Sequence, residues 1–156
     1  MTVNKTLSEA IEKHGTRRES LLPVLQYVIS KERWLKEDLL EDVAAAFGMS
    51  PSEVYGVATF YSFLDTEPRG RYVIRVCRTI SCDMAGKSAI IDALKNELKV
   101  GVGETTPDGL FTLLETNCMG WCHQGPAMLV NDDVYTELNP ESVVAVVQKY
   151  RNMEKQ

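Results

Sequence analysis

The sequence predicts an α+β protein in which an N-terminal helical bundle, residues 1–70, precedes a domain of order β-α-β-β-β-α, residues 71–156. Two observations support this division. Apolar residues recur at helical spacing through the first seventy residues, whereas runs rich in β-branched residues, which suit strands, begin only afterwards. The tetrapeptide Glu67-Pro68-Arg69-Gly70 separates the two patterns. We therefore expect the domain boundary there.

Two capping signals predict the first pair of helices. Thr6 to Glu9 and Thr16 to Glu19 both have the Thr-x-x-Glu form of a capping box, in which hydroxyl and carboxylate bond the free N–H groups of a helix start. Two short helices are expected to follow them. Because Pro23 lacks an N–H group, it should kink or restart the second helix nearby.

Two more helices complete the predicted bundle. An apolar stripe over residues 39–47 indicates the third helix, with Gly48 as its left-handed stop. Ser50 then supplies an N-cap, Pro51 the first helical position and Glu53 the third position of a fourth helix. The region 1–70 is thus predicted to be entirely helical.

The second half of the chain alternates between extended and helical patterns. The predicted strands are 72–77, 110–115, 127–130 and 134–137, and the predicted helices are about 84–98 and the segment after Asn139-Pro140. The last two strands flank Asn131-Asp132-Asp133 as a hairpin. A crossover followed by a hairpin and a final helix is how a small thioredoxin-like sandwich is assembled. We therefore expect a thioredoxin-like fold.

Composition excludes several classes of partner. The formal net charge of −5 argues against nucleic acid, because phosphate binding needs clustered cations. No window approaches the roughly 18 consecutive apolar residues of a spanning helix, so no direct membrane insertion is expected. The first five residues lack the apolar stretch of a signal peptide. These features predict a cytoplasmic protein.

The four cysteines of the chain form two close pairs. Cys77 and Cys82 have four residues between them, and Cys118 and Cys122 have three. Because cytoplasmic thiols stay reduced, such pairs indicate metal ligands or redox groups before disulfide bridges. Each pair follows a predicted strand. If those strands are parallel neighbours, both loops emerge at one edge of the sheet and the two pairs form a single site.

Spacing favours iron over zinc without excluding zinc. Two irons with two thiolates each match two pairs, so a [2Fe-2S] cluster suits the pattern. Zinc ribbons prefer two intervening residues, and these loops are longer, yet a zinc-stapled structural subunit without a redox role remains the alternative. Gly120 lets backbone N–H groups approach sulfur, and the helix after Cys82 directs its positive end to the same place.

The remaining candidates for chemistry are weaker. His123 beside Cys122 invites comparison with a Rieske centre, which the presence of four cysteines disfavours. Residues 101–103 are only a fragment of a dinucleotide fingerprint and are interpreted as a turn. If electrons come from NADH, another chain must therefore bind the NADH and its flavin.

Five segments together indicate a family. Three segments lie in the second half of the chain: residues 77–82 with the first cysteine pair, residues 105–113, and residues 118–122 with the second pair, followed by Gly125-Pro126. Two more, residues 21–23 and 56–61, lie in the helical half. They resemble the thioredoxin-like [2Fe-2S] subunit of NADH:quinone oxidoreductase. The resemblance implies a [2Fe-2S] cluster, and its ligands are implied to be Cys77, Cys82, Cys118 and Cys122.

The same resemblance implies a role in a larger complex. Subunits of this kind transfer electrons and are not themselves catalytic. They dock beside a flavin-bearing, NADH-oxidising subunit, which holds FMN and NADH, together with further iron–sulfur subunits. Similar subunits serve in NAD-linked and electron-bifurcating hydrogenases and in formate dehydrogenases, so the resemblance does not choose among complexes. Met119, Trp121 and His123 depart from the commonest form of the second cysteine loop.

Overall fold

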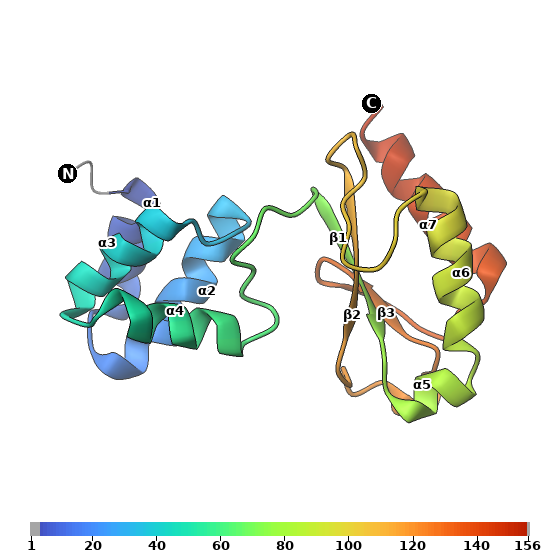
Figure 1. Ribbon diagram of the computed structural model, residues 1–156, viewed down its shortest axis with the longest axis horizontal. Coiled ribbons are helices and arrows are strands. Elements are labelled where there is room, and N and C mark those ends of the chain that lie inside the picture. The colour runs from blue at the N-terminus through green and yellow to red at the C-terminus, as the bar shows by residue number, and fades with distance from the viewer. Residues whose placement is uncertain (1–3, 156) are drawn as a thin grey trace. The chain divides into compact units, whose positions relative to one another are not determined.

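The computed structural model describes residues 4–155, and its internal contacts divide the chain into two compact units. The helical unit extends to Pro68 and the sheet unit begins at Arg69 (Figure 1). No helix within residues 4–155 is long and apolar enough to cross a membrane.

Between residues 4 and 68 the helical unit has four α-helices and one short 3₁₀ helix. They are α1 (Lys5–His14), η1 (Arg18–Ser20), α2 (Leu21–Glu32), α3 (Glu37–Phe47) and α4 (Pro51–Phe60). Helix α1 packs on α2, and α3 packs on α4. One apolar core joins them, to which each α-helix contributes, and its fully enclosed members include Leu7, Leu25, Val28, Val43 and Val54.

The predicted end of the third helix and the predicted start of the fourth helix are confirmed. Gly48 adopts a left-handed conformation at the end of α3, with φ of 62°. Ser50 caps α4 through a reciprocal capping box with Glu53, and Pro51 occupies the first turn. Local hydrogen bonds determine these ends, so the sequence identifies them well.

The first two helix starts differ from the prediction. The cap of α1 is Asn4, whose side chain accepts from the Thr6 N–H, while the Thr6 hydroxyl donates to Glu32. The 3₁₀ turn η1 precedes α2, whose N-cap Ser20 makes no side-chain capping bond. Pro23 interrupts nothing, because it lies in the first turn of α2, where N–H groups have no helical partner.

Over residues 69–155 the sheet unit contains four strands in the order β2-β1-β3-β4. The strands are β1 (Tyr72–Cys77), β2 (Phe111–Thr116), β3 (Met128–Val130) and β4 (Asp133–Tyr135). Strands β1 and β2 are parallel, whereas β3 is antiparallel to both β1 and β4. The strands therefore follow the predicted order, and the ends of β2, β3 and β4 differ from the prediction by one or two residues.

Helices α6 (Lys87–Leu98) and α7 (Pro140–Met153) pack on each other and lie on the same side of the sheet (Figure 1). Alternate residues of the strands point into the core beneath them. The enclosed members of this core include Ile74, Val76, Ile90, Leu94, Phe111, Leu113, Met128, Val143 and Val147. This second core holds the strands, and hence the loops beyond them, in place.

The predicted helix at about 84–98 is two helices. Helix α5 (Ile80–Met84) ends before Gly86, and α6 begins at Lys87. Gly86 has φ of 102°, a left-handed conformation that interrupts a right-handed helix. The predicted helix was wrong in running through Gly86, because the apolar periodicity of α6 does not extend N-terminally beyond this glycine. The separate helix α5 contains Cys82.

Candidate metal centre

Strand register brings the two cysteine segments to one edge of the sheet. Cys77, the last residue of β1, pairs with Thr116, the last residue of the parallel strand β2. Cys118 follows two residues later. Because parallel strands run in the same direction, their carboxyl ends meet at one edge. The condition for a single site, that the two strands be parallel neighbours, is met.

Cys77 and Cys82, here called the inner pair, are enclosed by protein. Their exposed fractions are 2% and 1%, and Ala127 packs against both. The Cys77 N–H donates to the Ala127 carbonyl at 3.0 Å. The Thr79 hydroxyl lies 3.1 Å from the Cys77 sulfur. The inner pair is therefore held by a strand, a helix and a neighbouring hydroxyl.

Cys118 and Cys122, here called the outer pair, lie at the surface. Both side chains are exposed, and their sulfur atoms are 3.1 Å apart. Gly120 has φ of 87°, and its N–H points to the Cys118 sulfur at 3.4 Å. The expectation that this glycine directs an N–H group at sulfur is confirmed.

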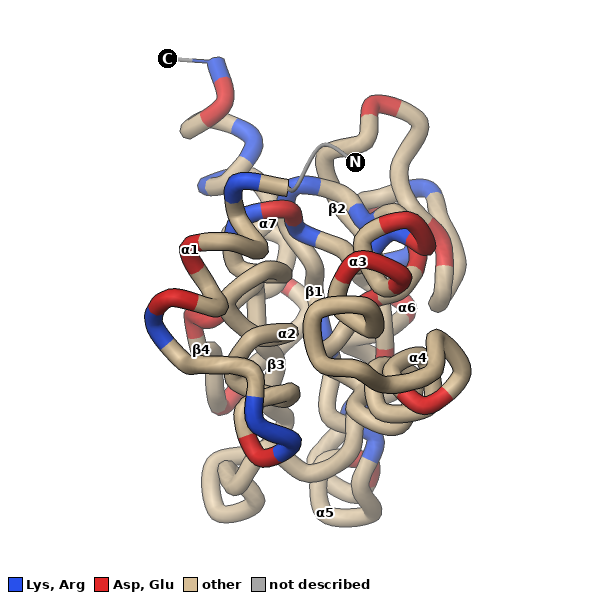
Figure 2. The backbone as a smooth tube through the Cα atoms, turned by 90° about the vertical axis from the view of Figure 1, so that its left-hand side faces the viewer, with Lys and Arg blue, Asp and Glu red and all other residues tan. Residues whose placement is uncertain are grey.

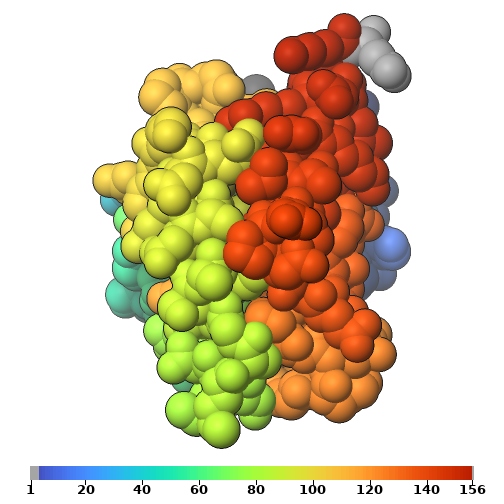
Figure 3. Space-filling model, turned by 90° about the vertical axis from the view of Figure 1, so that its right-hand side faces the viewer, coloured from blue at the N-terminus to red at the C-terminus, as the bar shows by residue number. Residues whose placement is uncertain are grey.

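The two pairs are neighbours in space. A Cβ atom placed on Gly125, which follows the outer pair, would lie 3.3 Å from the Cys82 sulfur. The backbone N–H of Met119, between the outer cysteines, lies close enough to the Cys77 sulfur to help lower the pKa of Cys77. Figure 3 shows α5, in green, beside the orange segment around residue 120 at one end of the sheet unit. All four sulfurs thus belong to this end, which we call the cysteine end.

The local environment shifts the pKa values of three of the thiols, and not all in the same direction. Burial raises the pKa of Cys77, but hydrogen bonds from the side chain and backbone of Thr79 outweigh it and leave the pKa below the usual thiol value. Burial raises the pKa of Cys82, and the adjacent Cys77 thiolate adds to this effect. The hydrogen bond with Cys118 raises the pKa of Cys122. Metals bind thiolates, so metal affinity should rise with pH as Cys82 and Cys122 lose their protons.

The pairing of the thiols suits a two-iron cluster. Each iron of a [2Fe-2S] cluster takes two thiolates from the protein, and here two adjacent thiol pairs have an N–H group and a hydroxyl at their sulfurs. Among residues 4–155, no group of three or more His, Cys, Asp or Glu side chains is arranged to hold a single metal ion.

Few charged residues lie in the segments that carry the cysteines. Residues 116–127 contain no Lys, Arg, Asp or Glu, and α5 contains only Asp83. The exposed Arg78 is a charged neighbour, because its guanidinium donates to the side-chain oxygen of Asn117, beside Cys118, at 3.0 Å. Figure 2 shows this end of the chain mostly in tan. Three exposed apolar side chains lie near the cysteines, namely Ile80 at 71%, Met84 at 83% and Trp121 at 38% exposure. We call these three residues the apolar rim.

Sequence reasoning missed part of this centre. It did not identify Thr79, Gly125 or Ala127, whose contacts with the inner sulfurs depend on tertiary packing. The helix predicted to begin at about residue 84 also begins later than expected, because α6 starts at Lys87. The short distance from Thr79 to Cys77 in the sequence was the one available signal, since a hydroxyl two residues from a thiol can reach it.

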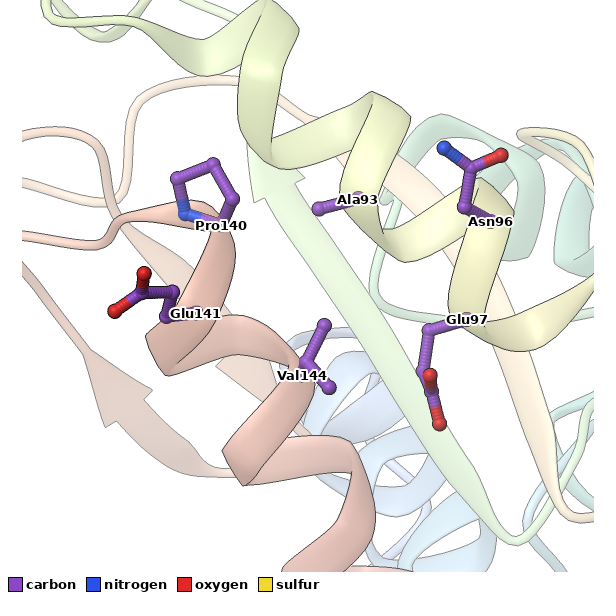
Figure 4. A pocket seen from close by; sticks show the side chains of 6 residues that line it. All are labelled: Ala93, Asn96, Glu97, Pro140, Glu141 and Val144. Carbon is purple, nitrogen blue, oxygen red and sulfur yellow. The ribbon is translucent and has the colours of Figure 1, made fainter.

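Each of the two histidines packs against an aromatic ring. His123 stacks on Trp121 at a ring-centroid distance of 6.1 Å, and His14 makes an edge contact with Tyr27 in the helical unit. A groove between α6 and α7 is a separate feature of the sheet unit (Figure 4). Its lining consists of Ala93, Asn96, Glu97, Pro140, Glu141 and Val144, without a cysteine.

The chain belongs to the thioredoxin-like [2Fe-2S] ferredoxin family, whose sequence pattern it matches over residues 7–151. Two relatives show the extent of the similarity. NADH-quinone oxidoreductase subunit 2 of Thermus thermophilus is 42% identical over 121 residues, which cover 78% of this chain and 67% of the relative. A subunit of the NADH-quinone oxidoreductase of Rhizobium meliloti is 34% identical over 155 residues, covering 99% of this chain and 92% of the relative.

A solved structure is similar at the level of fold and sequence. It is the crystal structure of an NAD⁺-reducing [NiFe]-hydrogenase in the air-oxidised state, with a TM-score of 0.75 and 27% identity. The match covers 85% of this chain and 23% of the hydrogenase chain, so this protein corresponds to under a quarter of that chain. These findings confirm the family resemblance, the α+β thioredoxin-like fold class and the [2Fe-2S] cluster as the cofactor of the family.

Proposed function

We propose that this chain is an electron-transfer subunit whose single [2Fe-2S] cluster exchanges electrons with the flavin of a partner NADH-oxidising subunit. The proposed ligands are Cys77, Cys82, Cys118 and Cys122. The observation that supports this proposal is the meeting of two cysteine pairs at the ends of the parallel strands β1 and β2. The chain itself performs no catalysis in this proposal.

Each pair has its own task in holding the cluster. The inner pair anchors it to the rigid sheet unit, because both cysteines belong to regular elements and are enclosed. The outer pair closes over it from a loop, with the Gly120 N–H directed at sulfur. When bound, such a cluster supplies one-electron redox chemistry, and hydrogen bonds to its sulfurs set its potential. Thr79 and Gly120 would have that role here.

The surface of the cysteine end supports exchange with a protein partner. The outer pair is exposed, the residues of the apolar rim lie close to the cysteines in the sequence, and residues 116–127 carry no formal charge. Such a surface can be covered by another protein at little cost in desolvation. FMN and NADH would be bound by that partner, in a complex with further iron–sulfur subunits. We also propose a cytoplasmic location and two domains, residues 1–70 and 71–156.

Metal analysis of the purified full-length chain tests the cofactor. We expect about two irons and two sulfides per chain and a paramagnetic signal after reduction. Stoichiometric zinc without colour would instead support the zinc-stapled scaffold and refute the redox role.

Substitutions test the ligands. Cys77→Ser and Cys118→Ser should lose or strongly perturb the visible absorbance while the helical unit keeps its far-ultraviolet circular dichroism. His123→Ala is the matched control in the same loop, and its absorbance should be unchanged because the ring stacks on Trp121. A spectrum unaffected by both cysteine substitutions, or lost in the histidine variant, would contradict the ligand assignment.

The flavin partner can be tested by mixing. A reduced flavoprotein that co-purifies with the chain should bleach the cluster absorbance in a single-turnover experiment. Met84→Glu, which places a charge in the apolar rim, should slow this transfer without changing the isolated spectrum. Equal rates of electron transfer to the parent chain and to Met84→Glu would indicate that the partner docks elsewhere.

A further inference from the structure

The outer cysteine pair has the geometry of an unformed disulfide. The two sulfurs are 3.1 Å apart, whereas a disulfide bond is about 2.05 Å long. Closing this gap needs a movement of about 1 Å. The intervening loop can supply it, because Gly120 and Trp121 are exposed and belong to no strand or helix. Both thiols are also open to a dissolved oxidant.

The inner pair lacks these properties. Cys77 is fixed by the hydrogen bonds of β1, and Cys82 lies within α5. Their exposed fractions of 2% and 1% leave almost no access for a soluble reagent. Reaction of a buried thiol requires local opening of the structure, which lowers its rate in proportion to the equilibrium population of the open form. The two pairs should therefore differ strongly in reactivity.

We propose that Cys118 and Cys122 are a covalent modification site at which the cluster-free chain forms an intramolecular disulfide with a low-molecular-weight disulfide such as oxidised glutathione as the oxidant. One outer thiol attacks the reagent, which forms a mixed disulfide and releases one glutathione thiol. The other outer thiol then attacks the protein sulfur of that bond and releases the second glutathione. One S–S bond forms in the protein as one S–S bond of the reagent is reduced to two thiols.

This modification would control when the chain accepts its cofactor. A closed outer pair offers no thiolates to iron, while the inner pair remains reduced and enclosed. A reductant must reopen the bond before a cluster can be bound by all four cysteines. The inference rests on the proposed function only in taking the cluster-free chain as a state preceding cluster loading. Formation of the disulfide can be measured without any cluster.

The positions of Lys and Arg make the two pairs separable by trypsin. Cleavage places Cys77 in residues 76–78, Cys82 in residues 79–87 and both outer cysteines in residues 100–149. The test uses the full chain, stripped of metal by a ferrous chelator under reducing conditions. The stripped protein is then freed of reductant and treated with oxidised glutathione. Remaining thiols are alkylated, and the peptides are analysed by mass spectrometry.

We expect peptide 100–149 to lose two hydrogens and take up no alkyl group, while the two inner peptides are alkylated. Closure of the outer pair should be at least about tenfold faster than any cross-link between the inner peptides, because the inner thiols need local opening. Cross-linked inner peptides at a similar rate, alkylation of all four cysteines, or a persistent glutathione adduct on peptide 100–149 would each overturn the proposal.

Two variants sharpen the test. Cys118→Ser should stop at a glutathione adduct on Cys122, because no second thiol can resolve it. Cys82→Ser is the matched control and should close the outer pair as the parent protein does. Adding dithiothreitol to the oxidised parent should restore cluster loading from iron and sulfide. If the fully reduced chain takes up no cluster, the proposed function fails. Whether the outer disulfide forms is decided separately, by the peptide masses alone.

Discussion

Gly125 offers a specific test of how tightly the protein encloses the inner sulfurs. Its φ of −72° and ψ of 160° are open to any residue, so Gly125→Ala introduces no backbone strain. The added Cβ would lie 3.3 Å from the Cys82 sulfur and 3.6 Å from the Ala85 Cβ. The first of these is tighter than an ordinary contact, so a neighbour must move by a few tenths of an ångström.

The cost depends on whether the sulfur is free to move. In the cluster-free chain the Cys82 side chain can turn slightly, so the free energy of unfolding should change little. A sulfur held by iron cannot turn, and overpacking of this kind costs about 1–3 kcal/mol. Because each 1.4 kcal/mol corresponds to about tenfold in rate, the cluster should be lost about 5- to 150-fold faster.

Decay of visible absorbance in the presence of a ferrous chelator measures this rate. Gly56→Ala is the matched control, because a Cβ at Gly56 meets nothing within 4 Å. Its cluster lifetime should equal that of the parent protein. A Gly125→Ala protein with the parent lifetime would refute the argument that this contact supports the ligand. A fall of about 1–3 kcal/mol in the free energy of unfolding of cluster-free Gly125→Ala would show that the added Cβ destabilises the fold itself.

Three further outcomes are expected. Thr79→Val removes the hydroxyl 3.1 Å from the Cys77 sulfur and should lower the one-electron midpoint potential by about 40 mV, the equivalent of about 1 kcal/mol, in a redox titration. An unchanged potential would exclude this hydroxyl as a donor to the reduced centre. Burial raises the pKa of Tyr150, so the unfolded chain loses this proton first and stability should fall above about pH 10. Above about pH 10, the denaturant midpoint of Tyr150→Phe should fall less with pH than that of the parent protein. Identical pH dependence in the two proteins would contradict the role of Tyr150. Gly70→Ala would place a Cβ 2.8 Å from the Phe111 carbonyl carbon and should cost at least about 2 kcal/mol in urea unfolding, whereas a cost under about 0.5 kcal/mol would contradict it.

Local interactions explain why the sequence alone predicted so many of the elements. Ser50 with Glu53, and Asn139 with Ser142, form caps through bonds between residues one turn apart, and a proline follows each N-cap, so these patterns can be recognised without the rest of the fold. The capping box expected at Thr6 failed because Asn4 lies closer to the helix start and Glu32, far along the chain, takes the Thr6 hydroxyl. Long-range competition of this kind leaves no local pattern.

The sequence by itself determined the number and spacing of the thiols, the order of strands and helices, and the membership of a family. Tertiary structure decided that β1 and β2 are parallel neighbours in a register that sets Cys77 opposite Thr116. It also decided that one thiol pair is enclosed and the other exposed, and that Gly125 lies against the Cys82 sulfur. Strand pairing and burial depend on how the whole apolar core packs, and residues that are distant in the chain meet only through that packing.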